Sequence, residues 1–127
     1  NAGVFIDTTG LNPYHGLEIQ NLVGIIGRMN RKVHVHVVLP ATLNGADMPA
    51  IPYAYRALKP QSLVFTRLDE CHRYGAMLNT MLTHPTLMAG TITKSADPAH
   101  APAQLDAASF AKLLTTAPTP LWQKEGS

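Results

Sequence analysis

Short apolar runs that alternate with stretches of helical periodicity most constrain how this chain can fold. Four segments have the apolar, β-branched composition of strands: 4–6, 33–39, 62–66 and 87–93. Four others repeat apolar residues every three or four positions and predict helices: 16–29, 48–58, 70–82 and 103–114. This alternation predicts an α/β fold in which a mostly parallel sheet carries helices on both faces.

Composition narrows the class of protein. Apolar residues make up 46% of the chain and charged residues 14%, with a net charge of +2, which excludes a disordered chain. One cysteine excludes a disulfide scaffold and favours a cytoplasmic setting. Its apolar runs are far shorter than the ~18 residues that span a bilayer. Charge is spread thinly along the sequence, so we expect no direct nucleic-acid partner.

The length of 127 residues suits one domain. We expect residues 1–3 to be the remnant of a cleaved tag, 4–116 to form the domain and 117–127 to be a tail. The tail contains Trp122, which could dock on the domain or on a partner.

The first candidate site follows the first expected strand and reads Asp7-Thr8-Thr9-Gly10. A carboxylate at the carboxyl end of a strand can hold a hydrated Mg²⁺ ion, and a glycine amide can approach a phosphate closely. The same four residues are also typical of an ordinary turn.

The second candidate site ends the third expected strand with Thr66-Arg67-Leu68-Asp69-Glu70. The Asp69 carboxylate could accept two N–H bonds from the edge of a guanine, while the Arg67 guanidinium lies over the base. Equally, Asp69 could cap the following helix. Nucleotide-binding folds have a phosphate and metal site at the end of one strand and a base-reading carboxylate at the end of a later strand. The two candidate sites follow each other in the same order.

These motifs resemble those of the SRP-type GTPases. Asp7-Thr8-Thr9-Gly10 is similar to the DTAG switch motif, and Phe65 to Glu70 is similar to the guanine-specificity motif, usually written TKLDE. Ala41-Thr42 with Asn44 to Asp47 resembles the small-residue loop after the intervening strand, and Tyr74-Gly75 with Leu78-Asn79 resembles the flagellar-placement branch, FlhF. The resemblance runs from about residue 4 to 114 and implies part of a P-loop NTPase-like domain.

The resemblance also implies roles for individual residues. Asp7 would hold Mg²⁺ through water, Gly10 would offer its amide to the terminal phosphate of GTP, and Asp69 would read guanine beside Thr66. Arg67 stands where the family has lysine, and Thr9 where it has alanine. The closing loop that should be rich in glycine instead reads Thr-Ile-Thr-Lys-Ser-Ala-Asp-Pro over 91–98.

One expected motif does not occur in this sequence. A phosphate-binding loop needs the pattern Gly-x4-Gly-Lys-Ser/Thr, and the 127 residues contain no Gly-Lys pair. In the family that loop precedes the switch motif. We therefore expect this chain to be a fragment or truncated relative that does not hydrolyse GTP alone, because nothing stabilises the charge that develops during phosphoryl transfer.

Other reactive residues give weaker alternatives. His34 and His36 share one face of an expected strand, and two histidines without further ligands favour a half-buried edge or interface over a structural metal. Cys71 and His72 are adjacent in the sequence, and adjacent side chains rarely meet. This disfavours a catalytic pair in which His72 would act as the base for a Cys71 nucleophile. The five methionines are more typical of core filling than of a binding groove.

Two hypotheses about function follow. In the first, the parent protein binds GTP with Mg²⁺ and acts in protein targeting or flagellar biosynthesis, with a homodimer or an SRP-type partner and peripheral membrane association as the family implies. In the second, the chain is a nucleotide-free, degenerate relative that serves as a protein-interaction module. An intact phosphate loop upstream of Val4 in the parent sequence would exclude the second.

Overall fold

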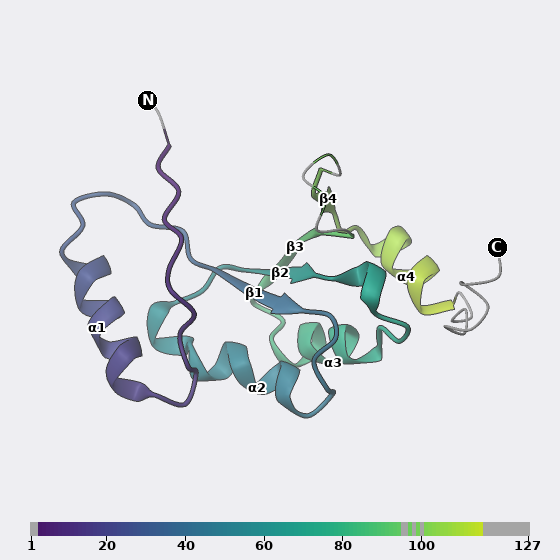
Figure 1. Ribbon diagram of the computed structural model, residues 1–127, viewed down its shortest axis with the longest axis horizontal. Helices are drawn as coiled ribbons and strands as arrows, with labels where there is room; N and C mark the ends of the chain where they lie inside the picture. Colours follow the sequence, from purple (N-terminus) through teal and green to yellow (C-terminus); the bar gives the residue numbers. More distant parts are fainter. Residues whose placement is uncertain (1–2, 95–96, 98, 100, 116–127) are drawn as a thin grey trace.

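A four-stranded sheet lies at the centre of the protein (Figure 1). The computed structural model describes residues 3–94, 97, 99 and 101–115. The strands stand in chain order: β1 (His36–Pro40), β2 (Ser62–Thr66), β3 (Met88–Ile92) and β4 (Ala103–Gln104). The first three are parallel, and β4 pairs antiparallel with β3. The sequence-based expectation of an α/β fold with a mostly parallel sheet is confirmed.

The core forms on one face of this sheet, where buried residues alternate with exposed residues along β1 and with half-buried residues along β2. Leu39 on β1 and Leu63 and Phe65 on β2 are at most 1% exposed. Methionines from two helices close over them, Met48 of α2 (Asp47–Ala54) and Met77 of α3 (Gly75–Thr83). Figure 1 shows α2 and α3 side by side beneath the sheet, which accounts for the burial of this face.

The opposite face is open beside β1, where Val38 is 58% exposed. Parallel sheets are ordinarily covered on both faces. The expectation of helices on both faces is therefore not met at this strand.

The α2 helix begins where the sequence places it, despite two prolines. The side-chain oxygen of Asn44 accepts hydrogen bonds from the amides of Ala46 and Asp47, which turns the chain into the helix. Pro49 lies in the first turn, where its missing N–H costs little. A 3₁₀ turn, η1 (Arg56–Leu58), ends the segment and leads to β2.

Three expected elements differ in the structure. Residues 4–6 form no strand, because no described segment pairs with them, and Phe5 is fully exposed. The helix expected over 70–82 begins at Gly75, because a 3₁₀ turn, η2 (Leu68–Glu70), and an extended Cys71 intervene. The helix expected over 103–114 is divided into β4 and α4 (Ala107–Thr115). The expected tail from residue 117, with Trp122, lies outside the described residues.

Asp106 separates β4 from α4. Its carboxylate accepts a hydrogen bond of 2.6 Å from the amide of Ser109, and this bond lowers the pKa of Asp106. The cap therefore acts above the pKa of an ordinary aspartate and is lost as pH falls through the lowered value. The helix that follows adds Phe110 to the core.

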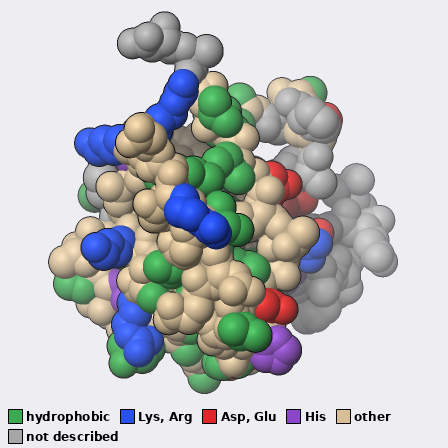
Figure 2. Space-filling model, turned by 90° about the vertical axis from the view of Figure 1, so that its left-hand side faces the viewer, with side chains coloured by type: hydrophobic (Ala, Val, Ile, Leu, Met, Phe, Trp, Pro, Cys, Tyr) green, Lys and Arg blue, Asp and Glu red, His purple; other side chains and the backbone are tan. Residues whose placement is uncertain are grey.

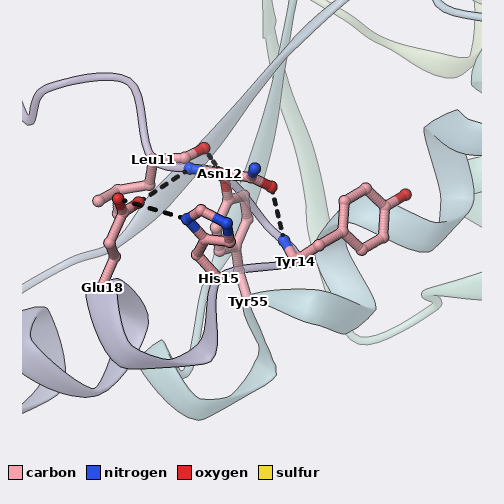
Figure 3. A network of polar contacts seen from close by, with 6 residues as sticks. All are labelled: Leu11, Asn12, Tyr14, His15, Glu18 and Tyr55. Atoms are coloured by element: carbon pink, nitrogen blue, oxygen red, sulfur yellow. Dashed lines mark hydrogen bonds and ion pairs between the residues drawn. The ribbon is translucent and has the colours of Figure 1, made fainter.

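The amino-terminal helix α1 (Gly16–Gly27) is tied to the end of α2 (Figure 3). The Tyr55 hydroxyl donates a hydrogen bond of 2.7 Å to the carbonyl oxygen of Leu11. In the adjoining turn, the Glu18 carboxylate accepts from the Asn12 amide and lies 3.7 Å from His15 Nδ1. Burial, and secondarily Glu18, raises the pKa of Tyr55. This network holds the start of α1 beside the segment that leads into β2.

None of the described helices is long and apolar enough to cross a membrane.

Because the core lies on one face of β1, substitutions of two neighbouring residues on this strand should affect stability differently. Leu39→Ala should lower the free energy of unfolding by about 2–5 kcal/mol, because it opens a cavity in the core. Val38→Ala should change it by less than ~1 kcal/mol, because Val38 faces solvent. Urea unfolding of both variants measures the difference. Equal losses would mean that the second face is also packed.

Candidate functional site

The loops that follow β1 and β2 lie next to each other at the carboxyl edge of the sheet. The carbonyl oxygen of Thr66, the last residue of β2, accepts a hydrogen bond of 2.8 Å from the amide of Ala41. Because parallel strands end at the same edge, the 41–47 loop and the 67–74 loop meet there.

A hollow of about 310 Å³ opens between these two loops. It is lined by Ala41, Thr42, Leu43, Glu70, Cys71, His72 and Arg73. Its rim brings together a hydroxyl, a carboxylate, an imidazole and a guanidinium. Glu70 belongs to the second candidate site of the sequence, whereas Cys71, His72 and Arg73 were not assigned to a site, since the sequence placed Cys71 at the start of a helix.

The Cys71 thiol holds the second loop in place. Its sulfur lies within hydrogen-bonding distance of two carbonyl oxygens, 3.2 Å from that of Ala41 and 3.0 Å from that of Arg73, and its one proton can be donated to either. The Tyr74 hydroxyl donates to the Cys71 carbonyl at 3.2 Å. Burial, and secondarily the Cys71 thiol, raises the pKa of Tyr74. Cys71 thus has a structural role in the loop.

The loop after β2 is anchored by Leu68, which is 4% exposed. The Leu68 amide donates to the carbonyl oxygen of Thr93 at 3.3 Å, and the Thr93 amide donates to Phe65 at 2.8 Å. These bonds place the end of β2 beside the chain that leaves β3. Of the closing loop expected over 91–98, residues 95, 96 and 98 lie outside the described part.

Arg67 takes a left-handed conformation, with φ of 59°. Such a conformation costs a residue with a side chain about 1–2 kcal/mol. Lys59 is the other described residue with a side chain and positive φ. Strained backbone of this kind is frequent at functional sites, where the surrounding structure enforces it.

The turn at Arg67 points Asp69 to solvent. Asp69 is exposed in η2, and α3 begins beyond it at Gly75, so the alternative that Asp69 caps this helix is wrong. The Arg67 guanidinium lies 3.7 Å from Glu70, with both side chains more than half exposed. An ion pair this exposed contributes little to stability. The Asp69 carboxylate is therefore accessible to a ligand.

The amino-terminal segment that carries Asp7 and Gly10 does not run along the carboxyl edge of the sheet (Figure 1). Gly10 adjoins Leu11, whose carbonyl oxygen is bound by the Tyr55 hydroxyl at the end of α2. In Figure 1 the amino-terminal segment runs past the end of the sheet where β1 begins. The structure thus brings Thr66, Arg67 and Asp69 together and does not bring Asp7 and Gly10 to them.

A metal site does not assemble from the described residues. Among them, no three histidine, cysteine or carboxylate side chains are grouped closely enough to bind an ion. His36 is hydrogen-bonded through Nδ1 to the Ser62 hydroxyl on the neighbouring strand, and His34 is exposed. Mg²⁺ is commonly held by one or two carboxylates together with substrate phosphates. Asp7 alone, exposed in an extended segment, does not fit such a site.

Comparison with protein-family models, with curated proteins and with solved structures finds no match for this chain.

Cys71 is the one cysteine of the sequence, so its thiol reports directly on the 71–74 loop. Tyr74→Phe should increase the rate at which a thiol reagent modifies Cys71, because it removes the hydrogen bond that fixes the Cys71 carbonyl. Tyr53→Phe, on an exposed tyrosine of α2, is the control. Equal rates in both variants would contradict a role for Tyr74 in holding this loop.

Proposed function

We propose that the loop after β2 recognises a guanine base, as the guanine-specificity loop of a protein related to the SRP-type GTPases. The observation that carries this proposal is the strained Arg67 followed by the solvent-facing Asp69, both fixed by the buried Leu68. Thr66 ends the strand that supports them.

The chemistry of the two side chains suits guanine. An ionised carboxylate has only acceptors, and guanine presents two adjacent N–H donors on one edge, so Asp69 can accept both. Adenine presents no such pair and would leave the carboxylate unsatisfied. The planar guanidinium of Arg67 can stack on the base with a geometry different from that of the family's lysine. The loop would therefore select the base and not the phosphates.

Binding of the nucleotide phosphates would require residues that the described structure does not bring together at the base-reading loop. Asp7 and Gly10 lie away from the base-reading loop, and the sequence has no Gly-Lys phosphate loop. We derive no hydrolytic step for this chain. Participation of the parent in protein targeting or flagellar biosynthesis, through a homodimer or SRP-type partner in the cytoplasm, is proposed on the resemblance of the motifs.

The nucleotide-free interaction module is the second candidate. The separation of Asp7 and Gly10 from Asp69 favours it, because a nucleotide site in working order would bring these residues together. It predicts no preference between guanine and other bases.

Substitution of Asp69 tests whether its carboxylate selects guanine over other bases. The chain should bind GMP weakly, with a dissociation constant of ~1 mM or above, and more tightly than AMP. Asp69→Asn should weaken GMP binding by about 1–3 kcal/mol and favour XMP, whose added carbonyl accepts from the new amide. NMR titrations with the three nucleotides measure this. Glu70→Gln, in the same turn, is the control.

Equal affinity for GMP and AMP, or equal effects of Asp69→Asn and Glu70→Gln, would reject guanine recognition by Asp69.

The backbone strain gives a separate test. Glycine at a left-handed position relieves about 1–2 kcal/mol of strain and costs ~0.5–1 kcal/mol of entropy. Arg67→Gly and Lys59→Gly should therefore each raise the free energy of unfolding slightly, by up to ~1 kcal/mol. Only Arg67→Gly should weaken GMP binding, because it removes the stacking group.

Urea unfolding and the same nucleotide titration measure both effects. If Arg67→Gly bound GMP as well as Lys59→Gly does, Arg67 would have no part in base recognition.

A further inference from the structure

The hollow between the loops after β1 and β2 has groups that base recognition does not use. Its volume of about 310 Å³ is at the lower end of the range for small-molecule sites. It opens at the carboxyl edge of the parallel strands, where such sheets ordinarily bind their ligands. Asp69, which carries the proposed base recognition, does not line it. The hollow can therefore hold a chemical group of its own.

Three side chains that line the hollow can donate hydrogen bonds to a ligand: Thr42, His72 and Arg73. Thr42 and Arg73 are exposed, and His72 is half-buried. Within the part of the chain that the structure describes, no ion pair or hydrogen bond engages these three side chains. A hydroxyl and a neutral imidazole each have one donor, and a guanidinium has five and is always charged. Donors from both loops therefore meet at the hollow without an acceptor.

The charge of the hollow favours an anion. Of the side chains that line it, Glu70 alone is acidic. Its carboxylate lies 3.7 Å from the guanidinium of Arg67, which offsets its charge. The Arg73 guanidinium has no such counter-ion among the described residues and leaves the hollow with an excess of positive charge.

The two loops are held together without a ligand. The Cys71 sulfur lies 3.2 Å from the carbonyl oxygen of Ala41, and the Ala41 amide donates to Thr66 at 2.8 Å. These contacts fix the segment that carries Thr42 beside the segment that carries His72 and Arg73. Binding then costs little ordering of the backbone, which favours even a small ligand.

We propose that this hollow binds a phosphate group, as inorganic phosphate or as a phosphate monoester. The Arg73 guanidinium can donate to two phosphate oxygens in its fork geometry. A phosphate group has three acceptor oxygens, so one remains for Thr42 and His72. A carboxylate has two oxygens and would leave part of this donor set unmatched. The site takes a single phosphate through residues other than Asp7 and Gly10, supplies no hydrolytic step, and is independent of base recognition.

The other basic residues provide a comparison. Figure 2 views the side of the protein on which α1 lies, and there several Lys and Arg side chains stand apart from one another, with hydrophobic and other side chains between them. Arg31, which follows α1, is exposed as Arg73 is. Its substitution changes the net charge equally but removes no donor from the hollow.

The test is an NMR titration of the full chain with inorganic phosphate at constant ionic strength. The dissociation constant should be ~1 mM, and the amide shifts should change most at residues 42–43 and 71–73. Arg73→Gln should weaken binding at least about tenfold, because it removes a charged pair of hydrogen bonds. Arg31→Gln should have little effect.

The hydroxyl contribution has its own matched pair. Thr42→Val should weaken phosphate binding about fivefold, because it removes one hydrogen bond to a charged ligand. Thr8→Val, on an exposed threonine of the amino-terminal segment, should leave binding unchanged. Circular dichroism confirms that all four variants fold.

GMP and guanosine distinguish the two sources of the phosphate. If GMP binds more tightly than guanosine and Arg73→Gln removes that difference, the phosphate belongs to the guanine nucleotide. If the two bind equally while inorganic phosphate still depends on Arg73, the hollow takes a separate phosphate compound. Equal binding of AMP and GMP, both through Arg73, would support the phosphate site and reject base recognition.

Three results would overturn the proposal. They are the absence of phosphate-induced changes at 42–43 and 71–73, equal losses for Arg73→Gln and Arg31→Gln, and binding of acetate as tight as that of phosphate. The last result would assign the hollow to carboxylates.

Discussion

The parallel pairing of β2 with both β1 and β3 is the constraint on which the rest of the structure depends. Leu63 and Phe65 on β2 are fully buried, and their neighbours on either side complete the core. Because the three strands run in one direction, the loops after them meet at one edge. The position of Arg67 and Asp69 follows from this pairing, since they begin where β2 ends.

The same pairing separates the protein into two ends with different chemistry. At the carboxyl edge, a strained turn directs Asp69 to solvent beside the chain that leaves β3. At the opposite end, α1 and η1 combine cations with exposed leucine, isoleucine and tyrosine.

The central strands could be predicted because their burial leaves a pattern in the sequence. Residues 62–66 are apolar and β-branched, and the structure gives β2 the same bounds. Residues 4–6 have similar composition but form no strand, because a strand needs a partner that local sequence does not reveal. The helix start was misplaced at Glu70 for a related reason: the left-handed Arg67 and extended Cys71 have no signature in residue type.

The central claim is that the loop after β2 binds a guanine base, and a map of backbone amide chemical shifts during a GMP titration tests it most directly. The account predicts that the largest changes occur at residues 67–70 and at 93–94, where the two loops adjoin, and that AMP produces much smaller ones. Changes confined to other regions, or equal changes with both nucleotides, would contradict it.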